Sequence, residues 1–140
     1  MVDLEIVRSR LDSIREMLDI LRRHQKLARE VFLSNRDIQL AVEHAFFIAI
    51  QSLLDLGSHI LADMGIKSIA DYRDVILKLG EAKVLPSQFT QTIVDMAGFR
   101  NRLIHEYQDT DPRKIYEFLQ NRLGDFEEFM RHIRDHFHIL

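Results

Sequence analysis

Residues 37–64, DIQLAVEHAFFIAIQSLLDLGSHILADM, decide the fold class of this chain. Apolar residues recur in this stretch at spacings of three and four, the pattern of a helix with one wide buried face. The residues on this face are Ala41, Val42, Ala45, Phe46, Ala49, Leu53, Leu56, Ile60 and Leu61. Ser34 or Asn35 can cap the helix at its start, and Gly65 fits a left-handed cap at its end. Gly57 lies in the helix and permits another helix to approach closely.

The segments on both sides of this helix are helical in pattern as well. A stripe at alternating spacings of three and four indicates a long first helix; it comprises Leu4, Val7, Leu11, Ile14, Leu18 and Leu21. The pattern breaks around residues 31–35. Further helices are predicted over residues 71–79, closed by Gly80, over 87–106, and over 112–136, with Asp111 as cap and Pro112 in the first turn. The sequence therefore predicts an all-α bundle of four long helices and one short helix, a single domain over residues 1–140.

Composition sets limits on location and partners. The chain has 140 residues, of which 46% are hydrophobic and 29% charged, as in soluble globular domains. It contains no cysteine, which excludes disulfides and thiolate metal sites. The acidic start lacks the pattern of a signal peptide, and the longest apolar run, residues 45–50, is too short to span a bilayer. We expect a cytoplasmic protein with no membrane partner. The net charge of −3 means that any contact with RNA needs a local cluster of cations or a partner.

The polar residues of GFRNRLIHEY, residues 98–107, stand out in an otherwise apolar helical segment. Arginine can hold a phosphate through a planar fork of donors, and histidine can move a proton near neutral pH. On an ideal helix Arg100 and Tyr107 lie about 20° apart, whereas Arg100 and His105 lie about 140° apart. That angle is awkward for one phosphate, unless the long arginine reaches round, the helix loosens, or a second copy of the chain faces the first. Two cations that follow could extend the positive patch: Arg113 and Lys114.

These residue types suit metal-independent cleavage of RNA. The ribose 2′-hydroxyl would attack the adjacent phosphate, while His105 moves a proton and Arg100 stabilises the charge on the phosphoryl oxygens. DNA lacks this hydroxyl and would be inert. One histidine cannot easily be both acid and base in one step, so a dimer with two copies of His105 at one cleft suits the chemistry. The alternative is structural, because cations near a helix C-terminus are favoured by the helix dipole.

The spacing of Arg100, His105 and Tyr107, with the residues between them, resembles the signature of the HepT-like ribonucleases, toxins of the HEPN superfamily. The similarity extends to residues 41–45, 55–60 and 72–85 and thus covers nearly the whole chain. At one position the chain departs from the family: His44 stands where the family usually places an arginine. We transfer no role to it.

The resemblance implies an all-helical homodimer with the ribonuclease cleft at the dimer interface. Arg100 and His105 would be the catalytic pair, and Asn101 and Arg102 would support the cleft. The implied partner is a small MntA-like nucleotidyltransferase antitoxin, which silences such toxins by transferring AMP from ATP onto the tyrosine of the motif, Tyr107. No cofactor is implied. The alternative is a non-catalytic HEPN protein that binds nucleotides or acts as the substrate-presenting partner of a nucleotidyltransferase.

Two other groups of polar residues allow a functional and a structural interpretation. Asp55 and His59 share one helix face, where Asp55 could orient a histidine in the cleft or form a local side-chain hydrogen bond. His132 and His136 are also four residues apart, but no third ligand is defined, so we expect no metal.

Overall fold

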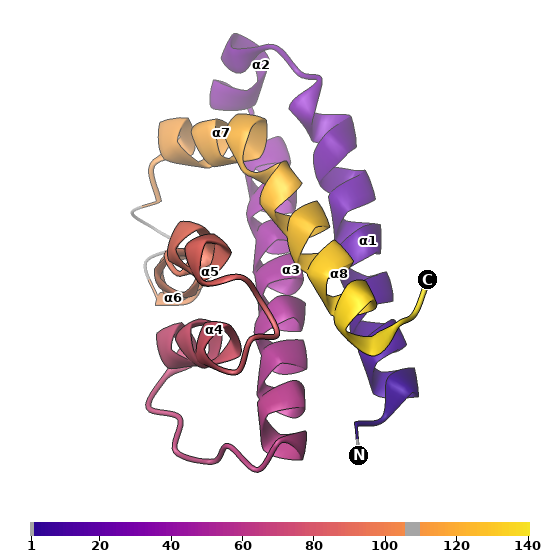
Figure 1. Cartoon of the computed structure of the whole chain (residues 1–140). Helices are drawn as coiled ribbons and strands as arrows, with labels where there is room; N and C mark the ends of the chain where they lie inside the picture. Colours follow the sequence, from indigo (N-terminus) through magenta and orange to yellow (C-terminus); the bar gives the residue numbers. More distant parts are fainter. Residues whose placement is uncertain (1, 106–109) are drawn as a thin grey trace.

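The computed structural model of the chain describes residues 2–105 and 110–140. In these two ranges it contains α-helices and no β-strand, which confirms the all-α fold (Figure 1). The helices are α1 (Leu4–Gln25), α2 (Arg29–Leu33), α3 (Arg36–Asp63), α4 (Tyr72–Glu81), α5 (Ser87–Ile93), α6 (Met96–His105), α7 (Pro112–Asn121) and α8 (Leu123–Phe137). The chain is more finely divided than the sequence predicted, because two of the predicted long helices are broken and α2 was not predicted.

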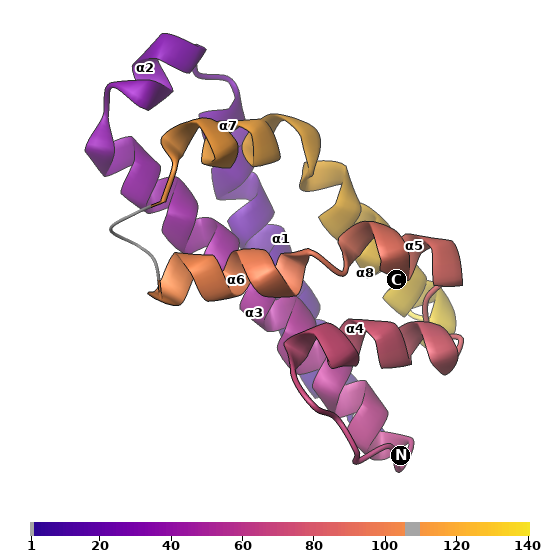
Figure 2. The same cartoon turned by 90° about the vertical axis from the view of Figure 1, so that its left-hand side faces the viewer.

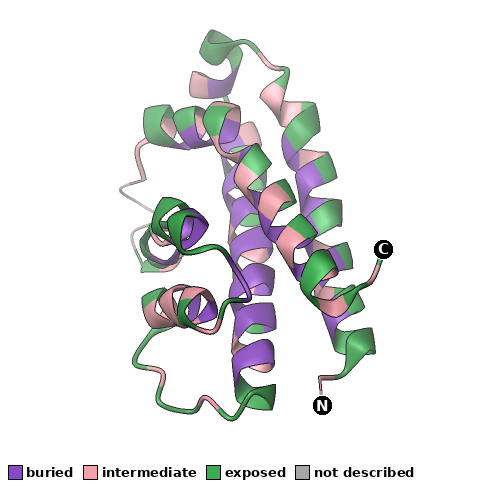
Figure 3. Cartoon of the chain, in the orientation of Figure 1, coloured by how far each residue is buried: buried purple, intermediate pink, exposed green. Residues whose placement is uncertain are grey.

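The long helix α3 is the centre of the fold. It runs beside α1 along most of its length, while α4 and α6 pack against it from another side (Figures 1 and 2). The buried residues follow the helix surfaces that meet at this centre (Figure 3). Phe46, midway along α3, is fully buried and contacts the rings of Phe99, Phe118 and Phe126, which belong to α6, α7 and α8. One aromatic cluster therefore ties four helices together.

Both predicted caps of α3 are confirmed. The Asn35 side chain accepts a hydrogen bond from the backbone N–H of Ile38 at 3.1 Å, which satisfies one of the free donors of the first turn. At the other end Gly65 has a φ of +80°, and the N–H of Ile66 donates to the carbonyl of Leu61 at 2.9 Å. This is a Schellman cap, in which glycine takes the left-handed position at no steric cost. α3 therefore ends within one residue of its predicted bounds.

The helix predicted over residues 71–79 is α4, but Gly80 does not close it. Asp71 is its N-cap, with the side chain accepting from the N–H of Asp74 at 2.9 Å, and the helix continues to Glu81. Gly80 is within α4 where α5 packs closely: a Cβ on Gly80 would lie 2.8 Å from Thr90 Cγ2. Glycine at this position thus allows α4 and α5 to pack closely, whereas the sequence predicted that it ends the helix.

The predicted helices over residues 87–106 and 112–136 are each broken, and one side chain braces both breaks. Residues 94 and 95 separate α5 from α6, and Arg122 separates α7 from α8. The Arg122 guanidinium donates to both carboxylate oxygens of Asp95 at 2.9 and 3.0 Å, to the Thr92 carbonyl at 3.0 Å, and to Asp125. Hydrogen bonding of Arg122 to the Asp95 carboxylate is the main cause that raises the pKa of Arg122 above its usual range. The local pattern of each segment is helical, and a contact between two distant segments holds the breaks.

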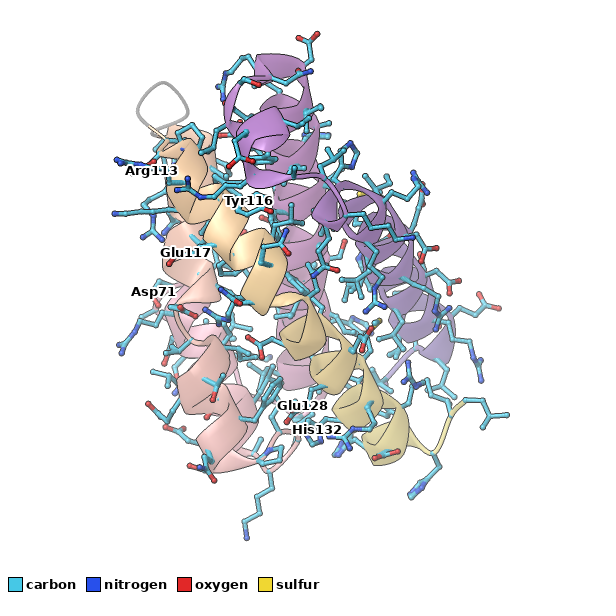
Figure 4. All side chains as sticks on the ribbon, turned by 90° about the horizontal axis from the view of Figure 1, so that it is seen from above. Asp71, Arg113, Tyr116, Glu117, Glu128 and His132 are labelled. Atoms are coloured by element: carbon cyan, nitrogen blue, oxygen red, sulfur yellow. The ribbon has the colours of Figure 1, made fainter. Side chains whose placement is uncertain are left out.

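The connection between α1 and α3 contains α2 and is fastened to α7. Figure 4 labels Tyr116 on α7, whose hydroxyl donates to the carbonyl of Leu27 at 3.2 Å. Beside it, the amide of Gln25 donates to the Leu119 carbonyl at 3.0 Å, and the amide of Gln120 donates to the Gln25 carbonyl at 3.0 Å. These bonds hold the middle and the end of α7 in place, and α7 forms one side of the cavity described below.

By length and composition alone, α3 is a candidate for a membrane-spanning helix. The uninterrupted apolar run within it, residues 45–50, is too short to have indicated this from the sequence. The most apolar window of α3 has a mean hydropathy of 1.5. In the structure 61% of that window is buried inside the protein, as in the core helix of a soluble domain.

Candidate active site

The motif of residues 98–107 lies on α6 and in the segment that follows it. α6 is fixed by its buried residues Met96, Ala97 and Phe99. The ring of Phe99 stacks on Phe118 of α7 with centroids 4.3 Å apart and packs edge-on against Phe46 of α3 at 5.7 Å. Figure 2 shows α6 lying across α3, with α4 and α7 on its two sides. The rest of α6 can therefore present polar groups on a rigid support.

Arg100 is half-buried where α6 meets α3 and α4. Its Nε donates to Oε1 of Gln51 on α3 at 2.8 Å, and one terminal nitrogen donates to Oδ1 of Asn101 at 2.9 Å. The guanidinium lies 4.6 Å from the ring centroid of Tyr72 on α4 and 5.7 Å from that of Phe47 on α3. These aromatic faces attract the cation and restrict its position. Within the described residues Arg100 thus uses two of its five N–H donors on the protein.

Gln51 can act as an acceptor for Arg100 because its amide is held from the other end. The amide nitrogen donates to Oδ1 of Asp55 at 2.8 Å and lies 3.3 Å from the hydroxyl oxygen of Tyr72. With the NH₂ group directed at these two oxygens, the amide oxygen must face Arg100. Asp55 therefore fixes Gln51, which in turn orients the guanidinium.

The sequence interpretation did not include Gln51 or Tyr72. The available signal was the spacing of four between Gln51 and Asp55 on one helix, which permits a side-chain hydrogen bond. The pair considered instead, Asp55 with His59, makes no such bond within the described part of the chain: Asp55 accepts from Gln51, and Nε2 of His59 is buried without a partner. Tyr72 could not be paired with Arg100 from sequence, since α4 and α6 meet only in the folded protein.

His105 is the last residue of α6 and is exposed. It is not among the hydrogen-bond partners of Arg100 in the described residues, in keeping with the angle of about 140° between these positions on a helix. Arg102 is also exposed and lies on another side of α6 from Arg100, where its guanidinium is 5.7 Å from the Phe99 ring centroid. Tyr107, the predicted modification site, lies outside the described residues.

The segment after the motif is attached to α3 at Glu43. This buried carboxylate accepts a hydrogen bond from Arg36 at 3.1 Å. Burial raises the pKa of Glu43, while the charge of Arg36 and hydrogen bonds from Thr110 and Arg36 act to lower it. His44, the departure from the family pattern, is exposed on the adjoining position, with its ring centroid 6.4 Å from that of Phe47.

His132 of α8 has partners other than His136. Figure 4 labels His132 and Glu128, whose side chains lie 3.1 Å apart, and the His132 ring packs against Phe89 at 5.2 Å. Among residues 2–105 and 110–140, no three His, Asp or Glu side chains gather as metal ligands do.

The fold is shared with solved toxin structures. The crystal structure of a toxin–antitoxin with AMP-PNP contains a chain that superposes with a TM-score of 0.86 at 18% identity, covering 94% of this chain and 98% of that one. The tri-AMPylated HEPN toxin of Shewanella oneidensis, in complex with an MNT antitoxin, superposes with a TM-score of 0.85 at 20% identity, covering 96% and 99%. These likenesses establish the HEPN type of helical fold.

Sequence comparison defines the family. The Ribonuclease HepT-like family matches residues 12–133, and the chain therefore belongs to the HepT-like ribonucleases, as the motif indicated. A relative named tRNA nuclease HepT, from Aphanizomenon flos-aquae, is 29% identical over 133 residues, which cover 94% of this chain and 89% of the relative.

Proposed function

We propose that this chain is the toxin of a toxin–antitoxin pair and that it cleaves RNA without a metal, with Arg100 and His105 as the catalytic groups. The observation that carries the proposal is the state of Arg100. Its guanidinium is held by Gln51 and Tyr72, yet in the part of the chain that the structure describes some of its donors remain for a phosphate. A donor fixed before the reaction stabilises the developing charge without reorganising in the transition state.

In this reaction the 2′-hydroxyl of the ribose attacks the neighbouring phosphorus, and the 5′-oxygen of the next nucleotide leaves. His105 exchanges the proton that this displacement requires, and its exposed position on α6 leaves it open to the substrate. Arg100 binds the non-bridging oxygens, whose negative charge grows as the fifth bond to phosphorus forms. Asn101 holds one terminal nitrogen of Arg100 and so supports the cleft.

A homodimer would complete this site. Arg100 and His105 lie on different sides of α6, so a guanidinium from one copy and an imidazole from the other can meet at a shared cleft. The α3 surface beside Arg100 supports this arrangement. It carries Leu40, which is 48% exposed, together with exposed His44 and half-buried Phe47 at helical spacings of four and three. A partially apolar stripe next to a proposed catalytic group can pack against the same stripe of a second copy of the chain.

The proposed regulator is an MntA-like nucleotidyltransferase that adds AMP to Tyr107. The solved relatives support this, since they include a tri-AMPylated toxin in complex with an antitoxin. Phosphates attached two residues after His105 would add negative charge where RNA must approach. We place the pair in the cytoplasm, without a membrane partner.

The test is expression of the chain in cells that lack the antitoxin, followed by cleavage assays on purified protein. Growth arrest and RNA cleavage, tRNA being tried first, should disappear in Arg100→Ala and His105→Ala. They should persist in the matched controls Arg131→Ala and His136→Ala, which alter exposed residues of α8. Cleavage should survive EDTA and spare DNA. Equal behaviour of all five proteins, without cleavage, would instead favour a non-catalytic partner of a nucleotidyltransferase.

The shared cleft has its own test. Mixed dimers of the Arg100→Ala and His105→Ala chains contain one intact guanidinium and one intact imidazole, which meet only if the cleft takes them from different copies. Co-refolding the two inactive chains should then restore part of the activity. No recovery, with heterodimers present by mass spectrometry, would show that each copy uses its own pair.

A further inference from the structure

A second feature of α6 is a cavity on the side that faces α7. Its volume is about 250 Å³. The lining residues are Phe99, Arg102, Leu103, Thr110, Asp111, Lys114, Ile115 and Phe118. Arg100 is not among them, so this cavity is separate from the guanidinium network described above. It opens within one turn of His105, because Arg102 and Leu103 precede that residue on the same helix.

The cavity combines an apolar wall with two cations. Phe99 and Phe118 stack with ring planes 12° apart, and Leu103 and Ile115 complete the apolar side. Arg102 and Lys114 are exposed at residues of α6 and α7, respectively. Within residues 2–105 and 110–140, neither forms an ion pair with a carboxylate. As far as these two ranges show, no carboxylate competes with an anion for either charge.

The cavity also has an acceptor. The Asp111 carboxylate is bound on one side by Arg113, at 3.2 and 3.3 Å, and also caps α7 through the N–H of Arg113 at 3.0 Å. Hydrogen bonds from Arg113 lower the pKa of Asp111, which keeps it ionised and acceptor-only at neutral pH. Such a carboxylate suits a ribose 2′-hydroxyl, which donates to an acidic residue in other nucleotide sites.

We propose that this cavity is a nucleotide subsite, with the base against the apolar wall of Phe99 and Leu103, the ribose 2′-hydroxyl on Asp111, and a phosphate on Arg102 and Lys114. The volume of about 250 Å³ lies below the usual range of about 300–1,000 Å³ for drug-sized ligands, so the cavity would enclose only part of one nucleotide, with the phosphate on the exposed cations. The subsite rests on the proposed function, because RNA bound at Arg100 and His105 would place its flanking nucleotide here. The same chemistry could bind free AMP, and the experiment distinguishes the two sources.

The experiment measures binding of a short single-stranded RNA in the His105→Ala background, where the RNA is not cut. Lys114→Gln should weaken binding and reduce the slope of log K against log salt by about 0.7, the effect of losing one phosphate contact. Leu103→Phe, which fills the cavity, should weaken binding by at least about fivefold with an unchanged slope, since the loss of one stacked base costs at least about this factor. Lys67→Gln, an exposed lysine outside the cavity, is the matched control and should change neither.

The outcomes separate the subsite from the nuclease. If both cavity variants bind RNA like Lys67→Gln, the subsite is wrong, even where growth arrest still depends on His105. If RNA binding is weakened as expected but the chain with His105 intact does not cleave RNA, the subsite holds and the nuclease proposal fails. A titration with AMP, using the same variants, tests whether the cavity binds the free nucleotide instead. AMP binding that Leu103→Phe abolishes, with RNA binding unchanged, would overturn the RNA subsite. Lys114→Gln, an exposed substitution, keeps the test valid should Leu103→Phe not fold.

Discussion

α4 packs closely against α3 at Gly57, and the substitution Gly57→Ala tests how much this close packing contributes to stability. A Cβ at this position would lie 2.8 Å from Val75 Cγ1 and 2.9 Å from Leu79 Cδ1. Both side chains are buried, at 2% and 0% exposure, and have little room to move. Gly124 on α8 provides the matched control, because a Cβ there would meet nothing within 4 Å.

The two substitutions share one energy term and differ in another. Alanine in place of helical glycine stabilises by about 0.5–1 kcal/mol through the lower entropy of the unfolded chain. Overpacking a filled core costs about 1–3 kcal/mol, and only Gly57→Ala carries this cost. The free energies of unfolding of the two variants should therefore differ by about 1–3 kcal/mol. For a domain of this size each kcal/mol shifts Tm by about 4 °C, so Gly57→Ala should melt some 4–12 °C below Gly124→Ala.

The assay is thermal unfolding of both purified variants by circular dichroism, with RNA cleavage measured well below either Tm. Displacing α4 also moves Tyr72, whose ring lies 4.6 Å from the Arg100 guanidinium. Gly57→Ala should thus lose cleavage activity while still folded, and Gly124→Ala should keep it. If Gly57→Ala melts at or above Gly124→Ala, α4 adjusts without cost and the close-approach argument is refuted.

Three further variants test other contacts. Arg122→Met should lower the free energy of unfolding by about 1–3 kcal/mol in urea titrations, because Asp95 and the Thr92 carbonyl lose their donors; a change no larger than that of Arg131→Met would contradict the role given to Arg122. Burial raises the pKa of Glu43 above 4.5, so the folded state holds this proton more tightly and stability falls as pH rises from 4.5 through the folded pKa. Glu43→Gln should remove that part of the fall in stability with pH. If the stability of the variant and of the unchanged chain depended on pH in the same way, this interpretation of Glu43 would be refuted. Gln51→Glu should place a carboxylate on Arg100 and reduce cleavage with the fold intact by circular dichroism; unimpaired cleavage would count against a role of Arg100 in phosphate binding.

The parts of the fold that the sequence predicted are those determined locally. The bounds of α3 follow from Asn35 at one end and Gly65 at the other, and both act through neighbours a few residues away. The two helix breaks are different. Each broken segment keeps its helical periodicity, and the side chain that braces both breaks, Arg122, lies 27 residues from Asp95 in the chain. Periodicity does not report a hydrogen bond of that sequence separation.

The candidate site divides in the same way. Its arginine and histidine were found in the sequence because their chemistry is distinctive and they lie on one short segment. The residues that orient Arg100 were missed because they lie on α3 and α4, and neither glutamine nor tyrosine is unusual at such positions. The cavity of Arg102 and Lys114 likewise forms only when α7 packs on α6.

The choice of a neutral amide between Arg100 and Asp55 has a consequence for catalysis. A carboxylate bound directly to the guanidinium would form an ion pair that an incoming phosphate would have to displace. Gln51 orients the same nitrogen while leaving the positive charge uncompensated at close range, and Asp55 acts one hydrogen bond further away. The Tyr72 ring covers a face of the guanidinium, so the remaining in-plane donors define the direction from which a phosphate can approach. Each chain thus presents an oriented cation, and the imidazole proposed for proton transfer lies on another side of α6, which is the geometry that the proposed cleft between two copies requires.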